Sequence, residues 1–361
     1  MKIGLVRRGY SPTGGAEIYL RRFAEAAVAA GHQVILFAEQ WPRADWPFEH
    51  VQVHSGTPRQ FASALAALRA EQACDFLFSL ERVFACDAYR AGDGVHAAWL
   101  ERRAQFEPFW KPWVRRFNGK HAEMLAIERQ LFSDGGARLV IANSAMVKAE
   151  IERHFAYPAE RIHVIHNGVP VHVSAPALRT EARRELSLND EDYVLLFAGS
   201  GWERKGLRFA IEAVKALPPK HTILLVAGRG SARGLPRSHR VRYLGASRDL
   251  SRLYAAADTF LLPTLYEPFS NACLEAAVGG LPVITTRHNG FAEVIEPGVQ
   301  GEIVNEPHHI QALVQAIEKW REAGPRVALQ ERLPALRARS SIAENVRATL
   351  AVIERNPRGS A

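Results

Sequence analysis

Two glutamates, Glu267 and Glu275, lie eight positions apart around the start of a predicted helix. Residues 258–263 contain an apolar run that ends at a proline, which predicts a buried strand shortly before Glu267. Ser270 has a hydroxyl that can cap the first turn of the helix, and the glycines at 279–280 can end it. Two carboxylates and a helix start are therefore expected together after one strand.

The start of this helix is a candidate anion site. The amides of Phe269, Ser270 and Asn271 lie at the positive end of the helix dipole, where they can bind the oxygens of a diphosphate. Glu275, roughly two helical turns beyond Glu267, can accept hydrogen bonds from ribose hydroxyls. The combination favours a nucleotide-sugar as ligand, although the glutamate pair alone would also fit two solvated charges at a helix end.

A basic pair follows another predicted strand. The strand ends near Gly199, and Arg204 and Lys205 come just before a helical stretch over 207–213. Arg offers a planar fork for phosphate oxygens and Lys a compact charge, so both can neutralise a departing diphosphate. A basic loop is also compatible with simple solvation. The loop with Arg229, after the next strand, is expected to border the nucleotide base.

The first predicted strand, over residues 2–6, leads to Gly14 and Gly15 and then to a helix over 16–30. Glycines at this position let the backbone approach a phosphate, and ligands of open α/β folds gather at the first such loop. The spacing differs from the Gly-x-Gly-x-x-Gly of dinucleotide enzymes, which disfavours a nicotinamide-dependent oxidoreductase.

Short strands alternate with amphipathic helices along the chain, which is typical of parallel sheets covered on both faces. Two such runs are expected, with a hinge in the irregular segment 166–176. The expected strands lie near residues 3–6, 34–37, 51–53, 76–79, 139–142 and 163–165, and then near 194–198, 222–227, 241–244, 259–262, 283–286 and 301–304.

The sequence resembles the retaining glycosyltransferases of the GT-B fold, family 4, in its glutamate pair and in the upstream Arg204 and Lys205. The resemblance implies two Rossmann-like domains whose parallel sheets face each other across a cleft, with a C-terminal helix that crosses back to the first domain. Residues 1–167 with about 340–361 would bind the acceptor, and 168–339 the nucleotide-sugar. It also implies that Arg204 and Lys205 hold the donor diphosphate, that Glu267 orients the donor, and that the leaving group is stabilised without a metal ion.

On the acceptor side, the sequence around Asp93, with Glu128 and Asn143 further on, is similar to the family 4 subgroup that glucosylates the heptose region of the lipopolysaccharide inner core. That similarity implies a catalytic role for Asp93, with His96 as the rival residue. It also implies UDP-glucose as donor, a lipid-linked glycan as acceptor and no separate cofactor. Asn143 and its neighbour are more simply explained as a helix cap.

Three alternatives to this function stay open. A GT-B-like nucleotide-sugar epimerase would share both domains and the diphosphate site but would need no acceptor. A transferase that uses GDP-mannose or another donor would differ in only a few hydrogen bonds. The third, a basic scaffold for nucleic acid, is disfavoured because the sequence has no RNP, zinc-finger or helix-turn-helix signature.

The formal net charge is +8, and residues 99–121 mix tryptophan and phenylalanine with arginine and lysine. Rings that prefer the headgroup level, beside cations that attract anionic lipid, predict that this segment binds a membrane surface. The alternative is that the rings are core and the charges are solvated, and Pro108 and Pro112 interrupt any long amphipathic helix.

No apolar run approaches the roughly 18 to 20 residues that a spanning helix needs. We therefore expect a cytoplasmic protein, peripheral on the inner face of the cytoplasmic membrane. The three cysteines, Cys74, Cys86 and Cys273, form no CxxC pair, and the histidines lack metal-ligand spacing, so no metal site is expected.

Overall fold

The chain forms two compact units in the computed structural model, which describes residues 1–10, 15–42, 46–108, 111, 119–170, 176–218, 221–247, 249–322 and 324–358. The first unit comprises Met1–Asn167 with Ile342–Ala361, and the second comprises Gly168–Ser341. Which unit binds donor and which binds acceptor stays a prediction.

The first unit contains a seven-stranded sheet in the order β3-β2-β1-β4-β5-β6-β7, and every pairing is parallel. The strands are β1 (Lys2–Val6), β2 (Gln33–Ala38), β3 (Glu49–Gln52), β4 (Phe76–Ser79), β5 (Cys86–Ala91), β6 (Ala137–Ala142) and β7 (Ile162–Val164). Its helices are α1 (Gly15–Ala29), α2 (Pro58–Ala67), α3 (His96–Ala104), α5 (Gly119–Leu131), α6 (Ala145–Phe155) and α13 (Ile342–Arg355). Single-turn 3₁₀ helices span Ala70–Gln72 and Ala159–Arg161.

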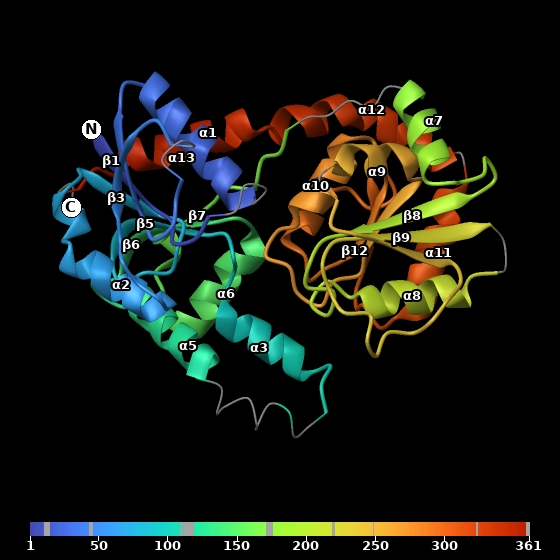
Figure 1. Cartoon of the computed structure of the whole chain (residues 1–361), viewed down its shortest axis with the longest axis horizontal. Helices are drawn as coiled ribbons and strands as arrows, with labels where there is room; N and C mark the ends of the chain where they lie inside the picture. Colours follow the sequence, from blue (N-terminus) through green and yellow to red (C-terminus); the bar gives the residue numbers. More distant parts are fainter. Residues whose placement is uncertain are drawn as a thin grey trace. The chain divides into compact units, whose positions relative to one another are not determined.

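The last helix, α13, packs in the first unit although it follows the second along the chain. It lies beside α1 (Figure 1), and the Tyr19 hydroxyl of α1 donates to Thr349 Oγ1 of α13 at 3.3 Å. Ile342, Val346 and Ile353 of α13 belong to the hydrophobic core of this unit.

The second unit contains a six-stranded parallel sheet in the order β10-β9-β8-β11-β12-β13. The strands are β8 (Tyr193–Ala198), β9 (Thr222–Ala227), β10 (Val241–Gly245), β11 (Thr259–Leu262), β12 (Val283–Thr286) and β13 (Gly301–Val304). The helices are α7 (Pro176–Glu185), α8 (Leu207–Ala216), α9 (Leu250–Ala256), α10 (Asn271–Val278), α11 (Ile310–Arg321) and α12 (Gly324–Arg339), with a 3₁₀ helix over Gly290–Val294.

Central strands are buried on both faces because helices cover the sheet from two sides. All six residues of β8 are buried, and α8 buries Leu207, Ala210, Ile211 and Val214, whose spacing of three and four follows the helical period. In each sheet the strand order reverses beside the first strand of the unit, between β1 and β4 and between β8 and β11. Such reversals are where open α/β sheets bind ligands, outside the carboxyl ends of the strands.

The predicted alternation omitted one strand, β5. All six residues of this strand are buried, but the charged Asp87 and Arg90 interrupt the apolar pattern from which a buried strand is predicted. Both side chains have partners from elsewhere in the chain. Asp87 Oδ2 accepts from the Leu77 amide at 2.7 Å, and the Arg90 guanidinium lies 3.9 Å from the ring centroid of Tyr19. Hydrophobic periodicity cannot detect a strand of this kind.

Candidate functional site

The carboxyl ends of β8, β9 and β11 bring together the predicted donor residues of the second unit. Arg204 and Lys205 lie between β8 and α8, and Glu267 lies between β11 and α10. Because β8 and β11 are neighbours in the sheet, the two loops meet at its carboxyl edge. The Leu265 amide donates to the Arg204 carbonyl at 2.9 Å, which ties the loops together through their backbones.

A buried carboxylate pairs with both cations. Lys205 Nζ lies 2.6 Å from Glu267 Oε2, and the Arg204 guanidinium lies 3.1 Å from Glu267 Oε1. The same guanidinium donates to the Tyr266 carbonyl at 3.1 Å. One carboxylate against two cations leaves a net positive charge, and the ion pairs with Glu267 hold both cationic side chains in place. The cluster can therefore receive an anion without ordering long side chains first.

Gly199 makes room for that lysine. Its φ is +138°, and a Cβ at this position would lie 2.7 Å from Lys205 Cε. Gly228, after β9, approaches just as closely, because a Cβ there would lie 2.2 Å from the Gly199 carbonyl oxygen. Side chains at either position would push the loop that carries Arg204 and Lys205 out of place.

The predicted start of α10 is confirmed: Ser270 is the N-cap, and its Oγ accepts from the Cys273 amide at 3.2 Å. The Ser270 amide donates to Asn289 Oδ1 at 3.2 Å, so one of the three amides proposed for the diphosphate is already bonded. Phe269 is buried, with its ring edge-on to that of Phe291. Asn289, which sequence reasoning missed, therefore organises the loop.

Glu275 lies within α10, and Arg229 lies in the loop that follows β9. The Tyr254 hydroxyl donates to Glu275 Oε2 at 2.9 Å, and burial together with this carboxylate raises the pKa of Tyr254 well above its usual value. Arg229 is exposed, and its amide donates to Ser200 Oγ at 3.1 Å in the loop after β8.

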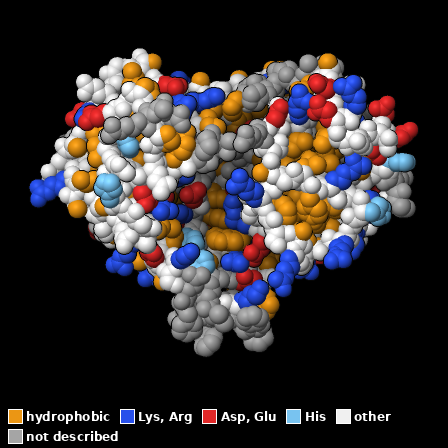
Figure 2. Space-filling model, in the orientation of Figure 1, with side chains coloured by type: hydrophobic (Ala, Val, Ile, Leu, Met, Phe, Trp, Pro, Cys, Tyr) orange, Lys and Arg blue, Asp and Glu red, His pale blue; other side chains and the backbone are white. Residues whose placement is uncertain are grey.

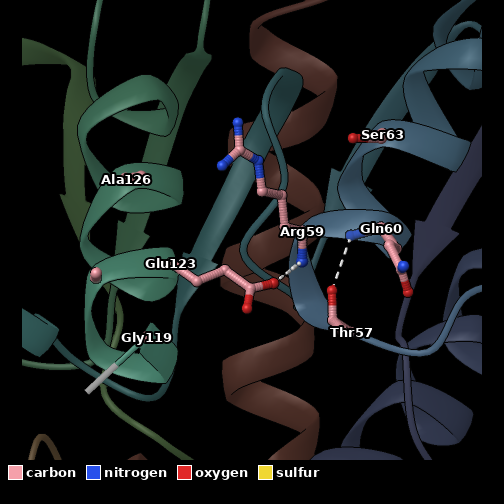
Figure 3. Close-up of a pocket in the computed structure, with 8 residues that line it drawn as sticks. Thr57, Arg59, Gln60, Ser63, Gly119, Glu123 and Ala126 are labelled. Atoms are coloured by element: carbon pink, nitrogen blue, oxygen red, sulfur yellow. Dashed lines mark hydrogen bonds between the residues drawn. The ribbon is translucent and has the colours of Figure 1, made fainter. Parts of the chain in front are cut away.

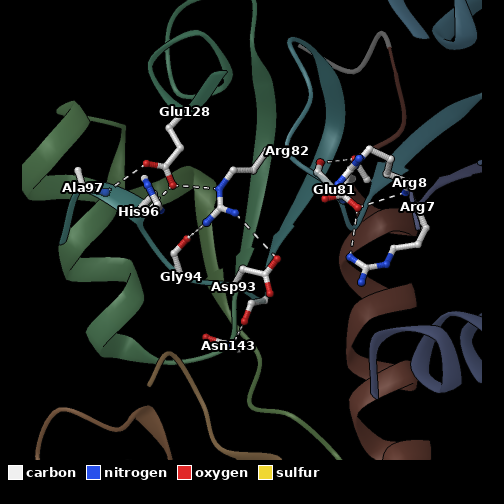
Figure 4. A network of polar contacts seen from close by, with 12 residues as sticks. Arg7, Arg8, Glu81, Arg82, Asp93, Gly94, His96, Ala97, Glu128 and Asn143 are labelled. Carbon is white, nitrogen blue, oxygen red and sulfur yellow. Dashed lines mark hydrogen bonds and ion pairs between the residues drawn. The ribbon is translucent and has the colours of Figure 1, made fainter. Parts of the chain in front are cut away.

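In the first unit, Asp93 follows β5 and presents its carboxylate to solvent, with 68% of the side chain exposed. The Arg82 guanidinium lies 3.9 Å from Asp93 Oδ2 and donates to the Gly94 carbonyl at 2.8 Å (Figure 4). Asn143 lies at the end of the neighbouring strand and donates to the Gly92 carbonyl at 3.0 Å. The loop that carries Asp93 is thus held on both sides of the carboxylate.

His96 lies in the same loop, at the start of α3. Its Nε2 is 3.0 Å from Nδ1 of His121, and its amide donates to Glu128 Oε1 at 2.7 Å. Burial, with Arg82 and His121 nearby, lowers the pKa of His96 to about 4. The imidazole is therefore neutral at pH 7.

Gly14 lies outside the described residues, and Gly15 opens α1. An ion-pair cluster joins that helix to the loops that follow β1 and β4. The Arg7 guanidinium lies 3.1 Å from Glu17 and 3.2 Å from Glu81, whose carboxylate also accepts from the Arg8 amide.

Only part of the predicted membrane segment, 99–108, 111 and 119–121, falls among the described residues. There, Trp99 and Phe106 are half-buried, and the guanidinium groups of Arg103 and Arg102 lie 5.8 and 4.8 Å from their ring centroids. On the face seen in Figure 2, Lys and Arg side chains are spread over both units. Within the described residues, no helix has the length and hydrophobicity to cross a membrane.

An open groove lies between α2 and α5, lined by Thr57, Arg59, Gln60, Ser63, Gly119, Ala122, Glu123 and Ala126 (Figure 3). The Arg59 amide donates to Glu123 Oε1 at 2.7 Å across it. None of the predicted donor or acceptor residues lines this groove, and Gly119 is the lining residue that falls in the predicted membrane segment 99–121. Among the described residues, no group of three or more His, Cys, Asp or Glu side chains could hold a metal ion.

Two further residues that sequence reasoning left without a role, Arg82 and Glu128, support the Asp93 loop. A charged residue two or three positions after a buried strand is a signal that could have identified Arg82. Glu128 is different because it lies within α5 and is entirely buried, so only the tertiary fold brings it to the loop.

Two family descriptions match the chain, "Glycosyltransferase Family 4" over residues 13–173 and "Glycosyl transferases group 1" over 192–322. The lipopolysaccharide glucosyltransferase WaaG of Escherichia coli is 28% identical over 334 residues, which cover 86% of this chain and 87% of that protein. A D-inositol 3-phosphate glycosyltransferase of Pseudarthrobacter chlorophenolicus is 26% identical over 375 residues, covering 92% and 88%.

Solved structures share the fold over nearly the whole chain. The crystal structure of WaaG, a glycosyltransferase involved in lipopolysaccharide biosynthesis, superposes with a TM-score of 0.80 at 24% identity, covering 97% of this chain and 99% of that one. Anabaena HepE in complex with UDP-glucose gives a TM-score of 0.73 at 18% identity, covering 98% and 100%.

Proposed function

Because this chain belongs to glycosyltransferase family 4 and has its GT-B fold, we propose that it transfers glucose from UDP-glucose to a lipid-linked glycan, such as the inner-core heptose of lipopolysaccharide. The sequence similarity to WaaG over most of both chains supports that choice of donor and acceptor. The observation that carries the proposal is the Arg204, Lys205 and Glu267 cluster at the carboxyl edge of the second sheet.

In this mechanism the two cations exchange Glu267 for the donor diphosphate. The bond between the anomeric carbon and the phosphate oxygen breaks, and Arg204 and Lys205 neutralise the charge that develops on UDP. Once the two cations have exchanged partners, the carboxylate of Glu267 is available to orient the sugar or its phosphate. The amides at the start of α10 and Glu275 would bind the diphosphate and the ribose.

The acceptor hydroxyl attacks the anomeric carbon on the face that UDP leaves. Attack on that face retains the configuration, and the proton of the hydroxyl passes to a phosphate oxygen of UDP. No covalent enzyme intermediate or metal ion is then required. Asp93, exposed at the end of β5, would act on the acceptor. The protein would work at the inner face of the cytoplasmic membrane, with the segment 99–121 on anionic lipid.

Transfer of labelled glucose to a heptose-terminated inner-core acceptor tests this function. We expect acceptor-dependent release of UDP, a product heavier by one hexosyl residue with the anomeric configuration of the donor, and no effect of EDTA. A product of inverted configuration would refute the retaining mechanism. Acceptor-independent conversion of UDP-glucose would favour the epimerase, and faster turnover of GDP-mannose would favour the other donor.

A further inference from the structure

The loop between β5 and α3 combines an exposed carboxylate with a fixed backbone. The side chain of Asp93 is 68% exposed, yet the backbone is bonded at Gly92 by Asn143, at Gly94 by Arg82 and at His96 by Glu128. A loop held in this way presents its carboxylate in one position before any acceptor arrives.

Glu128 is hydrogen-bonded both to Arg82 and to the start of α3. Its side chain is completely buried, and its carboxylate accepts from Arg82 Nε at 3.0 Å, from the His96 amide at 2.7 Å and from the Ala97 amide at 3.3 Å (Figure 4). Val95 occupies the N-cap of α3 and has no side-chain oxygen to cap the helix. Glu128 supplies that cap from a different helix, with its charge at the positive end of the α3 dipole.

We propose that Glu128 is a positioning residue that sets the place of the Asp93 carboxylate through Arg82, without touching the substrate. This inference rests on the proposed function, in which Asp93 acts on the acceptor. A buried charge persists only when it is paired. Glu128 therefore holds Arg82 inside the protein, and the guanidinium reaches the edge of the Asp93 carboxylate at 3.9 Å rather than pairing with it closely.

Replacing Glu128 by Gln keeps the shape of the side chain but removes its charge. Arg82 then loses its buried counterion, and Asp93 is a carboxylate within its reach. A close Arg82 to Asp93 pair would neutralise Asp93 and turn it away from the acceptor. The loss of activity would therefore come through Asp93, which separates positioning from a general loss of structure.

The test uses the full chain and compares Glu128→Gln, Asp93→Asn and the double variant in steady-state transfer. We expect Glu128→Gln to lower kcat with acceptor on the order of 10- to 100-fold, the range for a misplaced reacting group, and to leave the KM for UDP-glucose unchanged. The double variant should be no slower than the slower single variant, because residues that act as one unit are not additive. Glu128→Asp should recover part of the rate.

Asp87→Asn is the matched control. Asp87 is a buried carboxylate of the same sheet that pairs with Arg358 and Arg138 and lies at the opposite end of β5 from the loop. It should lower the melting temperature with kcat close to wild type. The inference is overturned if Glu128→Gln keeps the wild-type kcat, if its effect multiplies with that of Asp93→Asn, or if Asp87→Asn slows transfer equally. If the wild-type chain transfers no sugar, the proposed function fails first.

Discussion

At the scale of single residues, the candidate donor site contains one carboxylate that pairs with two cations. Glu267 neutralises part of the charge of Arg204 and Lys205 and keeps both side chains at the carboxyl edge of the sheet. A cluster that is already ordered can stabilise charge on a leaving group with little reorganisation, which is the basis of electrostatic catalysis.

We predict that Lys205→Ala lowers kcat more than it weakens donor binding. The expected loss is about 2 to 4 kcal/mol in the barrier, or on the order of 10²- to 10³-fold in rate. Steady-state kinetics and the Kd for UDP measure the two effects separately. Arg208→Ala removes an equal charge from an exposed position of α8 and should leave kcat close to wild type. A parallel loss in both variants would mean that overall charge, rather than position, matters.

His96 gives the protein a pH-dependent contribution to stability. Because its folded pKa is about 4 and its ordinary value is 6.5, the unfolded chain binds the proton more strongly. The contribution is complete above about pH 6.5 and is lost as the pH falls towards 4. Melting temperatures of the wild type should therefore fall more between pH 7 and 4.5 than those of His96→Gln. Identical pH dependence in the two proteins would contradict this assignment.

At the scale of elements, strand ends and helix starts carry the site. Glu267 and the Ser270 cap follow β11, the cations follow β8, and Asp93 follows β5. Parallel strands place all these loops at one edge of their own sheet, so short loops suffice to assemble each cluster.

We predict that Ser270→Ala destabilises the second unit by about 1 kcal/mol, the usual cost of removing an N-cap hydroxyl. It should also weaken UDP binding, since the cap fixes the first turn of α10. Thr57→Ala removes the equivalent cap from α2, where Oγ1 accepts from the Gln60 amide. Urea unfolding should show similar losses, and calorimetric titration should show weaker UDP binding for Ser270→Ala alone. Equal UDP affinity in both would exclude α10 from the diphosphate site.

At the scale of the whole molecule, the chain leaves the first unit after Asn167 and returns to it through α13. The core of the first unit is therefore incomplete until the last helix has been synthesised.

We predict that Ile353→Ala, at a fully buried position of α13, lowers the free energy of unfolding by about 2 to 5 kcal/mol. Ile353→Val should lower it by about 0.5 to 1.5 kcal/mol, because less volume is removed. Chemical denaturation followed by circular dichroism measures both. Stabilities equal to wild type would show that α13 does not contribute to this core.

A panel of nucleoside diphosphates tests the donor for the intact chain. Binding to the folded state alone stabilises by about 2.7 kcal/mol at a ligand concentration of 100 Kd, so the best ligand raises the melting temperature most. We expect UDP to exceed GDP and ADP and the shift to shrink in Lys205→Ala. A larger shift with GDP would contradict the uridine assignment.

The sequence by itself determined the parts of this protein that depend on local pattern. Buried strands such as β8, the cap at Ser270 and the loop positions of Arg204, Lys205 and Glu267 follow from hydrophobic period and helix-end chemistry, which act over a few residues. Only the tertiary structure decided the rest. The strand β5, with its buried Asp87 and Arg90, and the buried carboxylate of Glu128 are stable because partners distant in the sequence satisfy their charges, and no local pattern records such partners.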